Sequence, residues 1–149
     1  MKRLAVLGST GSIGRQALEV VRAFPEECQV VALSGWDNRD LLRQQAWEFR
    51  PRLLFCPGPL EPEALPPDCH RAASLEELAC HPEVDLVVLA VVGAAGLKPA
   101  LLALQAGKAL ALANKEPIVM AGPLLLSQAR GPGALLPVDS EPSAIWQCL

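Results

Sequence analysis

Short apolar runs alternate with amphipathic segments along the whole of this 149-residue chain. The runs have the length of strands, and the continuous apolar stretch Leu86–Val92 is typical of a parallel strand covered on both faces. The intervening segments carry apolar residues at helical spacing, as in Asp40–Phe49. Strands that alternate with helices predict an α/β fold, a doubly wound parallel sheet with helices on both faces.

The pattern also fixes where each element is expected. Residues 57–68 hold five prolines and a glycine, which predicts an irregular surface connection. Expected strands cover residues 2–7, 29–33, 52–56, 85–91, 109–113 and 134–138, and expected helices cover residues 12–24, 40–49, 74–80, 97–105 and 123–129.

A glycine-rich turn lies between the first strand and the first helix, and reads Gly8-Ser9-Thr10-Gly11-Ser12-Ile13-Gly14. A strand, a tight glycine turn and a helix N-terminus together bind the pyrophosphate of a dinucleotide in Rossmann-like folds. Gly8 would adopt the backbone angles of the turn, and Gly11, without a Cβ, would let a phosphate approach the main chain. Gly14 would let the helix pack closely on the strand. The alternative is an ordinary turn that merely needs glycine, and the motif by itself names no reaction.

Composition removes several classes of function. The net charge of −3, without a basic block, argues against a nucleic-acid partner. No apolar run reaches the roughly 18 residues of a membrane helix, and the apolar run after Met1-Lys2-Arg3 is too short for a signal peptide. Five cysteines without C-x-x-C spacing suggest reduced thiols and a cytoplasmic location.

Ligands of this fold bind beyond the carboxyl ends of the strands, and the end of the second strand selects the nicotinamide cofactor. There the chain reads Gly35-Trp36-Asp37-Asn38-Arg39. Asp37 favours NAD because a carboxylate accepts from the ribose 2′-hydroxyl, whereas Arg39 favours NADP because a guanidinium binds phosphate. Asn38 would cap the next helix or bond the ribose, and Trp36 would stack on adenine or cover the sheet edge. The choice of cofactor stays open at this point.

Polar triplets follow the last two expected strands. In Asn114-Lys115-Glu116, a lysine at the ligand edge can bind an anionic substrate and polarise an oxygen, although a plain surface turn is the alternative. In Asp139-Ser140-Glu141, two carboxylates on extended chain would point the same way and suit Mg²⁺ or Mn²⁺. The alternatives are an N-cap for a helix over residues 143–149 and a general acid–base pair.

Four of these segments, residues 7–14, 92–96, 112–116 and 136–141, together resemble the 1-deoxy-D-xylulose 5-phosphate reductoisomerase family. The resemblance covers essentially the whole chain. It implies an enzyme of the non-mevalonate isoprenoid pathway that rearranges a sugar-phosphate skeleton by retro-aldol and aldol steps. The family then reduces the resulting aldehyde with NADPH to give 2-C-methyl-D-erythritol 4-phosphate.

The resemblance also implies roles for individual residues. Asp139 and Glu141 would be two of three carboxylate ligands of Mg²⁺ or Mn²⁺. Lys115, Ser140 and Glu141 would bind the sugar-phosphate substrate, with Lys115 and Glu141 in catalysis. The expected cofactor-binding residues are Thr10, Gly11, Ser12, Ile13, Gly35, Asn38, Arg39, Asn114 and Glu116.

This chain departs from the family pattern at two places. The family turn after the second strand usually reads Ala-Gly-Lys/Arg/Ser-Asn, so Asp37 stands where a 2′-phosphate partner is expected, unless Arg39 substitutes. Pro142 replaces a histidine that commonly follows the metal-binding glutamate, at a position expected to open a helix.

The resemblance further implies a division into domains. Residues 1–149 would form an NAD(P)-binding domain, and residues 138–149 would begin the metal-binding catalytic segment. The family's catalytic and C-terminal domains are absent from the sequence, so we expect a cofactor-binding fragment of a homodimeric parent that turns over poorly alone. The alternative function is a non-catalytic dinucleotide-binding or dimerisation module.

Overall fold

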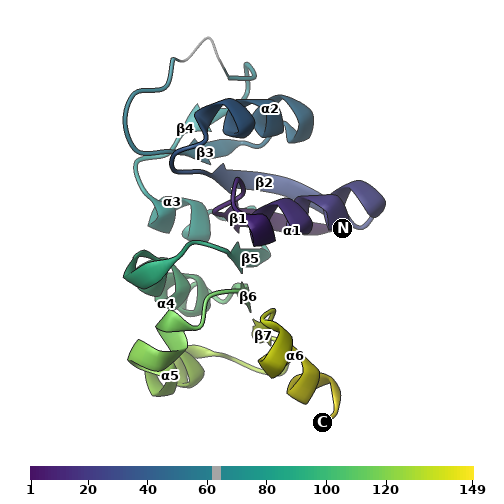
Figure 1. Ribbon diagram of the computed structural model, residues 1–149, viewed down its shortest axis with the longest axis vertical. Coiled ribbons are helices and arrows are strands. Elements are labelled where there is room, and N and C mark those ends of the chain that lie inside the picture. Colours follow the sequence, from purple (N-terminus) through teal and green to yellow (C-terminus); the bar gives the residue numbers. More distant parts are fainter. Residues whose placement is uncertain (62–64) are drawn as a thin grey trace.

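The computed structural model describes residues 1–61 and 65–149, so part of the expected connection over residues 57–68 lies outside the described residues (Figure 1). Within them, seven parallel strands form one sheet in the order β4–β3–β2–β1–β5–β6–β7. None of the helices in these ranges is long and apolar enough to cross a membrane. The strands are β1 (Lys2–Leu7), β2 (Cys28–Ser34), β3 (Leu53–Phe55), β4 (His70–Arg71), β5 (Leu86–Leu89), β6 (Ala109–Leu112) and β7 (Leu135–Pro137).

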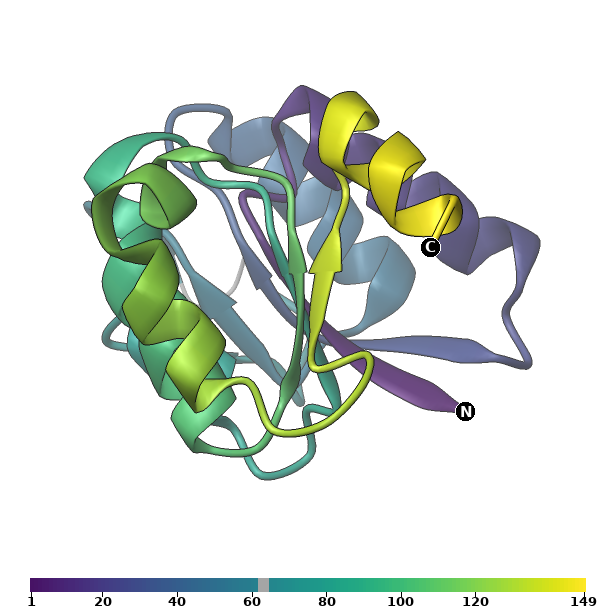
Figure 2. The same ribbon diagram turned by 90° about the horizontal axis from the view of Figure 1, so that it is seen from below.

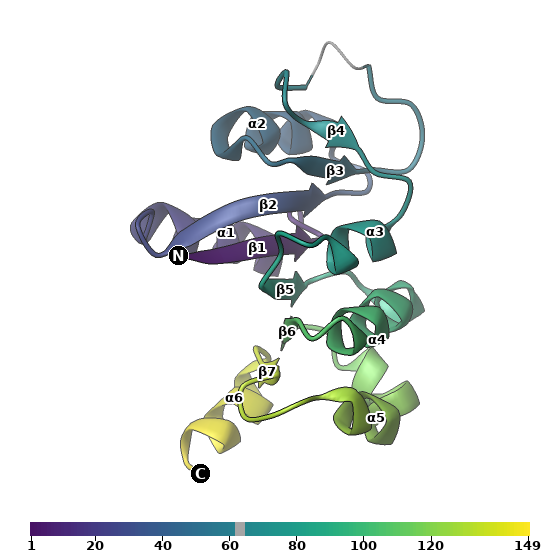
Figure 3. The same cartoon turned by 180° about the vertical axis from the view of Figure 1, so that it is seen from behind.

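Helices cover both faces of the sheet, as the alternating pattern predicts (Figure 2). The helices α1 (Ser12–Ala23), α2 (Arg39–Phe49) and α6 (Ser140–Gln147) lie on one side. Figure 3 shows α3 (Leu75–Cys80), α4 (Leu97–Gln105) and α5 (Glu116–Gln128) following one another along the other side. The predicted doubly wound α/β fold is therefore confirmed.

Strand alternation explains why one strand can serve two cores. Leu4 and Val6 of β1 belong to the apolar cluster with α1 and α2, whereas Ala5 and Leu7 belong to the cluster with α3 and α4. Since successive side chains point to opposite faces, an uninterrupted apolar run is what a strand covered on both sides requires. The strand β1 lies at the centre of the sheet, paired with β2 and β5, and the glycine turn follows its carboxyl end.

Helix ends follow from local side-chain chemistry. The Asn38 side chain accepts a hydrogen bond from the Leu41 amide at 3.0 Å and caps α2, which confirms the capping alternative for this residue. The helix α4 ends as predicted at Gly107, where φ is +74°. There the Lys108 amide donates to the Ala103 carbonyl and the Gly107 amide to the Leu104 carbonyl, a Schellman ending that satisfies the last carbonyls.

Apart from shifts of one or two residues at element ends, four described segments differ from the prediction, and the first is Gly93–Gly96, which forms a 3₁₀ helix (η2) instead of a turn. The strand β4 was not expected because its two residues are exposed and carry no apolar pattern. The helix expected at residues 123–129 is only the second half of α5, which begins at Glu116 and is interrupted at Ala121. Pro123 explains the interruption, since proline lacks an amide hydrogen and its ring clashes with the preceding turn. The last helix begins at Ser140, three residues earlier than its expected start.

Candidate functional site

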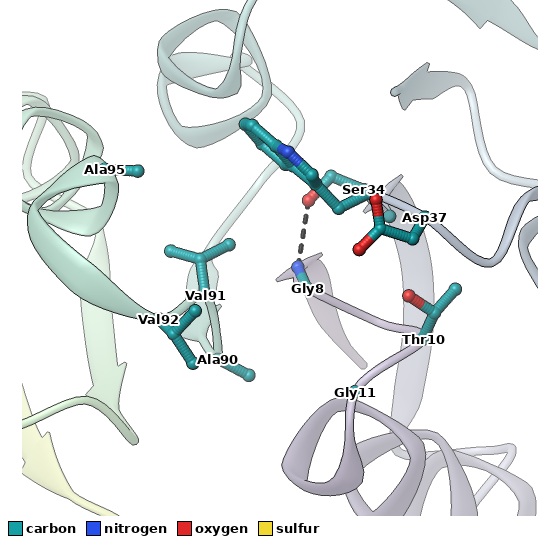
Figure 4. Close-up of a pocket in the computed structure, with 11 residues that line it drawn as sticks. Gly8, Thr10, Gly11, Ser34, Asp37, Ala90, Val91, Val92 and Ala95 are labelled. Carbon is teal, nitrogen blue, oxygen red and sulfur yellow. Dashed lines mark hydrogen bonds between the residues drawn. The ribbon is translucent and has the colours of Figure 1, made fainter. Parts of the chain in front are cut away.

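A cavity of about 420 Å³ opens at the carboxyl ends of β1, β2 and β5 (Figure 4). The sheet order places this opening where strand succession reverses, since β2 and β5 flank β1 on opposite sides. Open α/β sheets bind their ligands at such a switch point. We call this cavity the switch-point crevice; it is lined by Gly8, Thr10, Gly11, Ser34, Gly35, Trp36, Asp37, Ala90, Val91, Val92 and Ala95.

The surroundings of the three glycines in the turn differ in whether they would admit a side chain. Gly8 has φ of +89°, and a Cβ there would lie 2.7 Å from the Ala90 carbonyl oxygen. A Cβ on Gly14 would overlap the Gly8 carbonyl oxygen, so this glycine permits the close packing of α1 on the turn. At Gly11 the nearest atom to an added Cβ is 3.4 Å away, which is ordinary contact. The fold therefore requires Gly8 and Gly14, whereas Gly11 keeps open the space in front of the helix.

The N-terminus of α1 faces this space with its backbone donors. Gly11 occupies the N-cap position, no side chain caps the helix, and no acidic residue lies in its first turn. Uncapped amide groups and the helix dipole favour an anion at such a terminus. Thr10 lines the crevice, while Ser12 and Ile13 form the start of the helix.

A buried hydrogen-bond network holds the turn in place from below. The Ser9 hydroxyl lies 2.7 Å from Oε1 of Gln45 and 3.0 Å from the Ser34 carbonyl, and Nε2 of Gln45 donates to the Ser9 carbonyl at 2.9 Å. The Gly8 amide donates to the Ser34 hydroxyl at 2.9 Å. Ser9 is fully buried, so its hydroxyl serves the turn and not a ligand, unlike the exposed Ser12.

Sequence reasoning missed Gln45. Its signal was a polar residue at a buried position of α2, between Leu42 and Ala46. Burial of an amide is costly unless its donor and acceptor are both bonded, and here Ser9 bonds both.

The end of β2 supplies the far wall of the crevice. Gly35, Trp36 and Asp37 line it, and the Trp36 ring meets Phe55 edge-to-face at 6.1 Å between centroids. Arg39 is not among the lining residues, because its guanidinium donates to the carbonyl oxygens of the 57–59 segment. The structure therefore brings Asp37 to the crevice, while the assignment of Arg39 to a cofactor phosphate stays a prediction.

The end of β6 is fastened to the loop after β5. The buried Asn114 amide donates to the carbonyls of Val91 and Gly93, at 2.8 and 3.1 Å, and its oxygen accepts from the Glu116 amide. The Glu116 carboxylate accepts from the Gly93 amide. Both side chains position the crevice wall through these bonds, and their direct contact with a cofactor stays a prediction.

A second hollow, of about 360 Å³, lies at the ends of β6 and β7. We call it the β6–β7 hollow; it is lined by Ala113, Asn114, Lys115, Glu116, Asp139, Ser140 and Glu141. It brings together the predicted substrate and metal residues from two segments of the chain. The Glu141 backbone amide, the Ser140 hydroxyl and the nearby Lys115 lower the pKa of the Glu141 carboxyl, which favours the charged form that a metal requires.

The expected geometry of the two carboxylates was wrong. Asp139 occupies the N-cap position of α6 without making a side-chain capping bond, and Glu141 lies in the first turn. The extended-chain argument therefore does not apply, because Ser140 already begins a helix. Pro142 is the third helical residue instead of the first, still within the turn whose amides need no helical partner.

The donor set of the β6–β7 hollow partly fits a divalent metal ion. Asp139 and Glu141 offer the carboxylate oxygens that Mg²⁺ and Mn²⁺ prefer. In residues 1–61 and 65–149 no group of three or more potential ligands gathers. The two carboxylates therefore form a partial ligand set.

The fold and the switch-point crevice define a Rossmann-type α/β domain. Residues 4–122 match the family of 1-deoxy-D-xylulose 5-phosphate reductoisomerase. The chain belongs to that family, which confirms the resemblance seen in the four motifs.

Individual relatives agree with this assignment. The reductoisomerase of Pelotomaculum thermopropionicum is 46% identical over all of this chain, and that of Heliobacterium modesticaldum is 49% identical. The chain spans 41% of the length of each of these relatives.

Solved structures give the same picture. A reductoisomerase in complex with NADPH, fosmidomycin and magnesium superposes with a TM-score of 0.86 and 38% identity, over 100% of this chain and 39% of that one. The Zymomonas mobilis enzyme in complex with NADPH also has a TM-score of 0.86, at 36% identity, over 99% of this chain and 41% of that one.

Proposed function

We propose that this chain is the NADPH-binding part of a 1-deoxy-D-xylulose 5-phosphate reductoisomerase, which forms 2-C-methyl-D-erythritol 4-phosphate in isoprenoid biosynthesis. The observation that carries the proposal is the pairing of two cavities on adjacent strand ends of one sheet. The switch-point crevice presents an uncapped helix terminus, and the β6–β7 hollow presents a lysine and two carboxylates.

In the crevice, the start of α1 would hold the cofactor pyrophosphate through the amides of Gly11, Ser12 and Ile13 and the Thr10 hydroxyl. At the adenosine end, the Gly35 main chain would lie beside the ribose, because Gly35 lines the crevice and the position of its missing Cβ faces Thr10 and Leu42. The capping bond of Asn38 uses only its amide oxygen, so its amide nitrogen can still donate to the ribose. Asn114 and Glu116 would meet the cofactor from the opposite wall, held by their bonds to the loop after β5.

In the hollow, Lys115 and Ser140 would bind the sugar phosphate, with the Lys115 ammonium stabilising negative charge that develops on a substrate oxygen. Asp139 and Glu141 would hold Mg²⁺ or Mn²⁺, which supplies Lewis-acid polarisation of neighbouring substrate oxygens when bound. A third carboxylate would come from a catalytic domain, which in the relatives would belong to the part that this chain does not span.

The first test is cofactor binding by residues 1–149. Titration followed by nicotinamide fluorescence should show saturable NADPH binding, and its absence would leave only a structural role. The isolated chain should oxidise NADPH poorly or not at all when 1-deoxy-D-xylulose 5-phosphate and Mn²⁺ are added. Rapid turnover by residues 1–149 would contradict the assignment of the third ligand to another domain.

The second test restores the remainder of a reductoisomerase. A chimera that joins residues 1–149 to the corresponding C-terminal part of the Pelotomaculum relative should reduce the substrate with NADPH. In that chimera Lys115→Ala should abolish turnover while NADPH affinity remains, because Lys115 would bind the substrate, whereas its neighbours Asn114 and Glu116 hold the loop after β5. Turnover retained by Lys115→Ala would remove this residue from the chemistry.

A non-catalytic dimerisation module is the second candidate, favoured by exposed apolar side chains on the C-terminal helix. Ile145 and Trp146 of α6 are 65% and 52% exposed. Sedimentation of residues 1–149, together with the NADPH titration, distinguishes the two candidates. A dimer that binds no dinucleotide supports only the second. For the reductoisomerase we propose a homodimeric parent and a cytoplasmic location, the latter supported by five free thiols.

A further inference from the structure

We infer that Asp37 relaxes the choice between the two nicotinamide dinucleotides, so that this domain binds NADH at least as tightly as NADPH. The inference rests on the proposed function and concerns the adenosine end of the same crevice. It is carried by the position of one carboxylate, by the bonds of the nearest arginine, and by the charge of the residues around them.

Asp37 lies where a dinucleotide places its adenosine ribose. It follows the end of β2 by three residues and lines the crevice together with Gly8 and Thr10. Figure 4 shows its carboxylate on the crevice side of the chain, between Ser34 and Thr10. In Rossmann-type domains an acidic side chain at this strand end accepts hydrogen bonds from the ribose hydroxyls. The 2′-hydroxyl of NADH would therefore find an acceptor here.

The same position opposes the 2′-phosphate of NADPH. Among the lining residues in the described part of the chain, Asp37 alone carries a charge. A phosphate monoester carries close to two negative charges at neutral pH, and like charges brought together weaken binding. Within residues 1–61 and 65–149, neither a lysine nor an arginine lines the crevice to offset that repulsion.

The nearest candidate cations on α2 are already bonded elsewhere. The Arg39 guanidinium donates to the carbonyls of Pro57 and Pro59, at 3.1 and 3.2 Å. One turn further on, Arg43 pairs with Asp40. To reach a 2′-phosphate, Arg39 would have to give up two hydrogen bonds and turn towards a carboxylate-lined wall. Repulsion at Asp37 therefore acts on NADPH without an offsetting cation among the described residues that line the crevice.

The remaining contacts are common to both dinucleotides. The pyrophosphate that the start of α1 would bind and the adenine that could stack on Trp36 are chemically the same in NADH and NADPH. Selectivity consequently depends on the 2′ substituent and on Asp37.

The test measures the dissociation constants of NADH and NADPH with residues 1–149, at low and high ionic strength. The expected ratio of the NADPH constant to the NADH constant is 1 or more at low salt, and it should fall as salt screens the repulsion. In Asp37→Asn, which keeps the shape and removes the charge, NADPH should bind about tenfold tighter while NADH binds equally or more weakly. Asp68→Asn is the matched control, because it removes one negative charge in a separate hollow beside Gln29 and Arg50.

Each outcome decides between the alternatives. Wild-type protein that binds NADPH more than about twofold tighter than NADH at low salt would overturn the inference and leave the proposed function standing. Loss of NADPH affinity in Arg39→Ala, with NADH unchanged, would also overturn it, by showing that Arg39 leaves Pro57 and Pro59 for the phosphate. Absence of binding by both dinucleotides would refute the proposed function itself. Should Asp37→Asn fail to fold, the wild-type ratio alone decides.

Discussion

Gln45 should be essential to the glycine turn, although it lies on a helix remote in sequence. The substitution Gln45→Leu keeps a side chain of similar size in a position that is 3% exposed, and removes both bonds to Ser9. The Ser9 hydroxyl still reaches the Ser34 carbonyl, so the principal loss is the partner of the Ser9 carbonyl. The variant therefore isolates the contribution of the amide.

The magnitude follows from this geometry. A buried acceptor left without its donor costs about 1–3 kcal/mol, and the new apolar side chain offsets a part of the second lost bond. We expect the free energy of unfolding to fall by about 2 kcal/mol, which for a domain of this size lowers the melting temperature by about 4–8 °C. NADPH affinity should also fall, because the turn that aims the first amides of α1 is less firmly held.

Gln44 provides the matched control, since it is the neighbouring residue on the same helix and is exposed. Gln44→Leu should change the free energy of unfolding by less than about 0.5 kcal/mol. Urea unfolding followed by circular dichroism gives the midpoint of each variant, and the midpoints are compared where the dependence of the unfolding free energy on urea, the m-value, is the same. Equal midpoints for Gln45→Leu and Gln44→Leu would refute the reasoning that the Ser9–Gln45 network stabilises the turn.

The other predictions use single substitutions. Gly11→Ala should keep wild-type stability and weaken dinucleotide binding by about tenfold or more. Gly14→Ala should instead lower the free energy of unfolding by about 1–3 kcal/mol. Thermal melts in which Gly11→Ala is the less stable variant, or titrations in which it binds dinucleotide as wild type does, would contradict these roles. The Arg3 guanidinium and backbone amide lower the pKa of the Asp85 carboxyl. A carboxyl whose pKa is lower in the folded than in the unfolded state stabilises the fold at pH values above its unfolded-state pKa. This contribution is lost as the pH falls towards its folded-state pKa. The difference in free energy of unfolding between wild type and Asp85→Asn should therefore be constant at neutral pH and shrink below about pH 4. Urea unfolding at several pH values measures this difference. A difference that stays unchanged below that pH would exclude a stabilising ion pair.

Most of the fold could be predicted because the central strands are apolar on both faces. A continuous apolar run such as that of β5 fits few structures other than a strand covered on both faces. The ends of the helices could be predicted where a single residue determines them, as Asn38 does at the start of α2 and Gly107 does after α4. The strand β4 could not be predicted, since two exposed residues carry no signal. The interruption of α5 was equally hidden, because it depends on how the chain packs on either side of Pro123.

The candidate site was predictable where one segment makes it and unpredictable where distant segments meet. The glycine turn could be interpreted residue by residue from its spacing. The bond between Ser9 and Gln45 spans 36 positions, and that between Gly93 and Glu116 spans 23, so neither leaves a local pattern. The separation of Asp37 from Arg39, only two positions apart, also depends on the carbonyls of the 57–59 segment.

The order of the strands has a consequence for how this domain can evolve. The residues that would select the dinucleotide follow β2, whereas those that would act on the substrate follow β6 and β7, on the far side of β1 and β5. Mutations after β2 can therefore accumulate under selection for a different cellular reductant while the substrate chemistry is inherited unchanged. A protein engineer can use the same separation, exchanging residues 35–39 as a cassette to couple one reaction to a different metabolic supply of electrons.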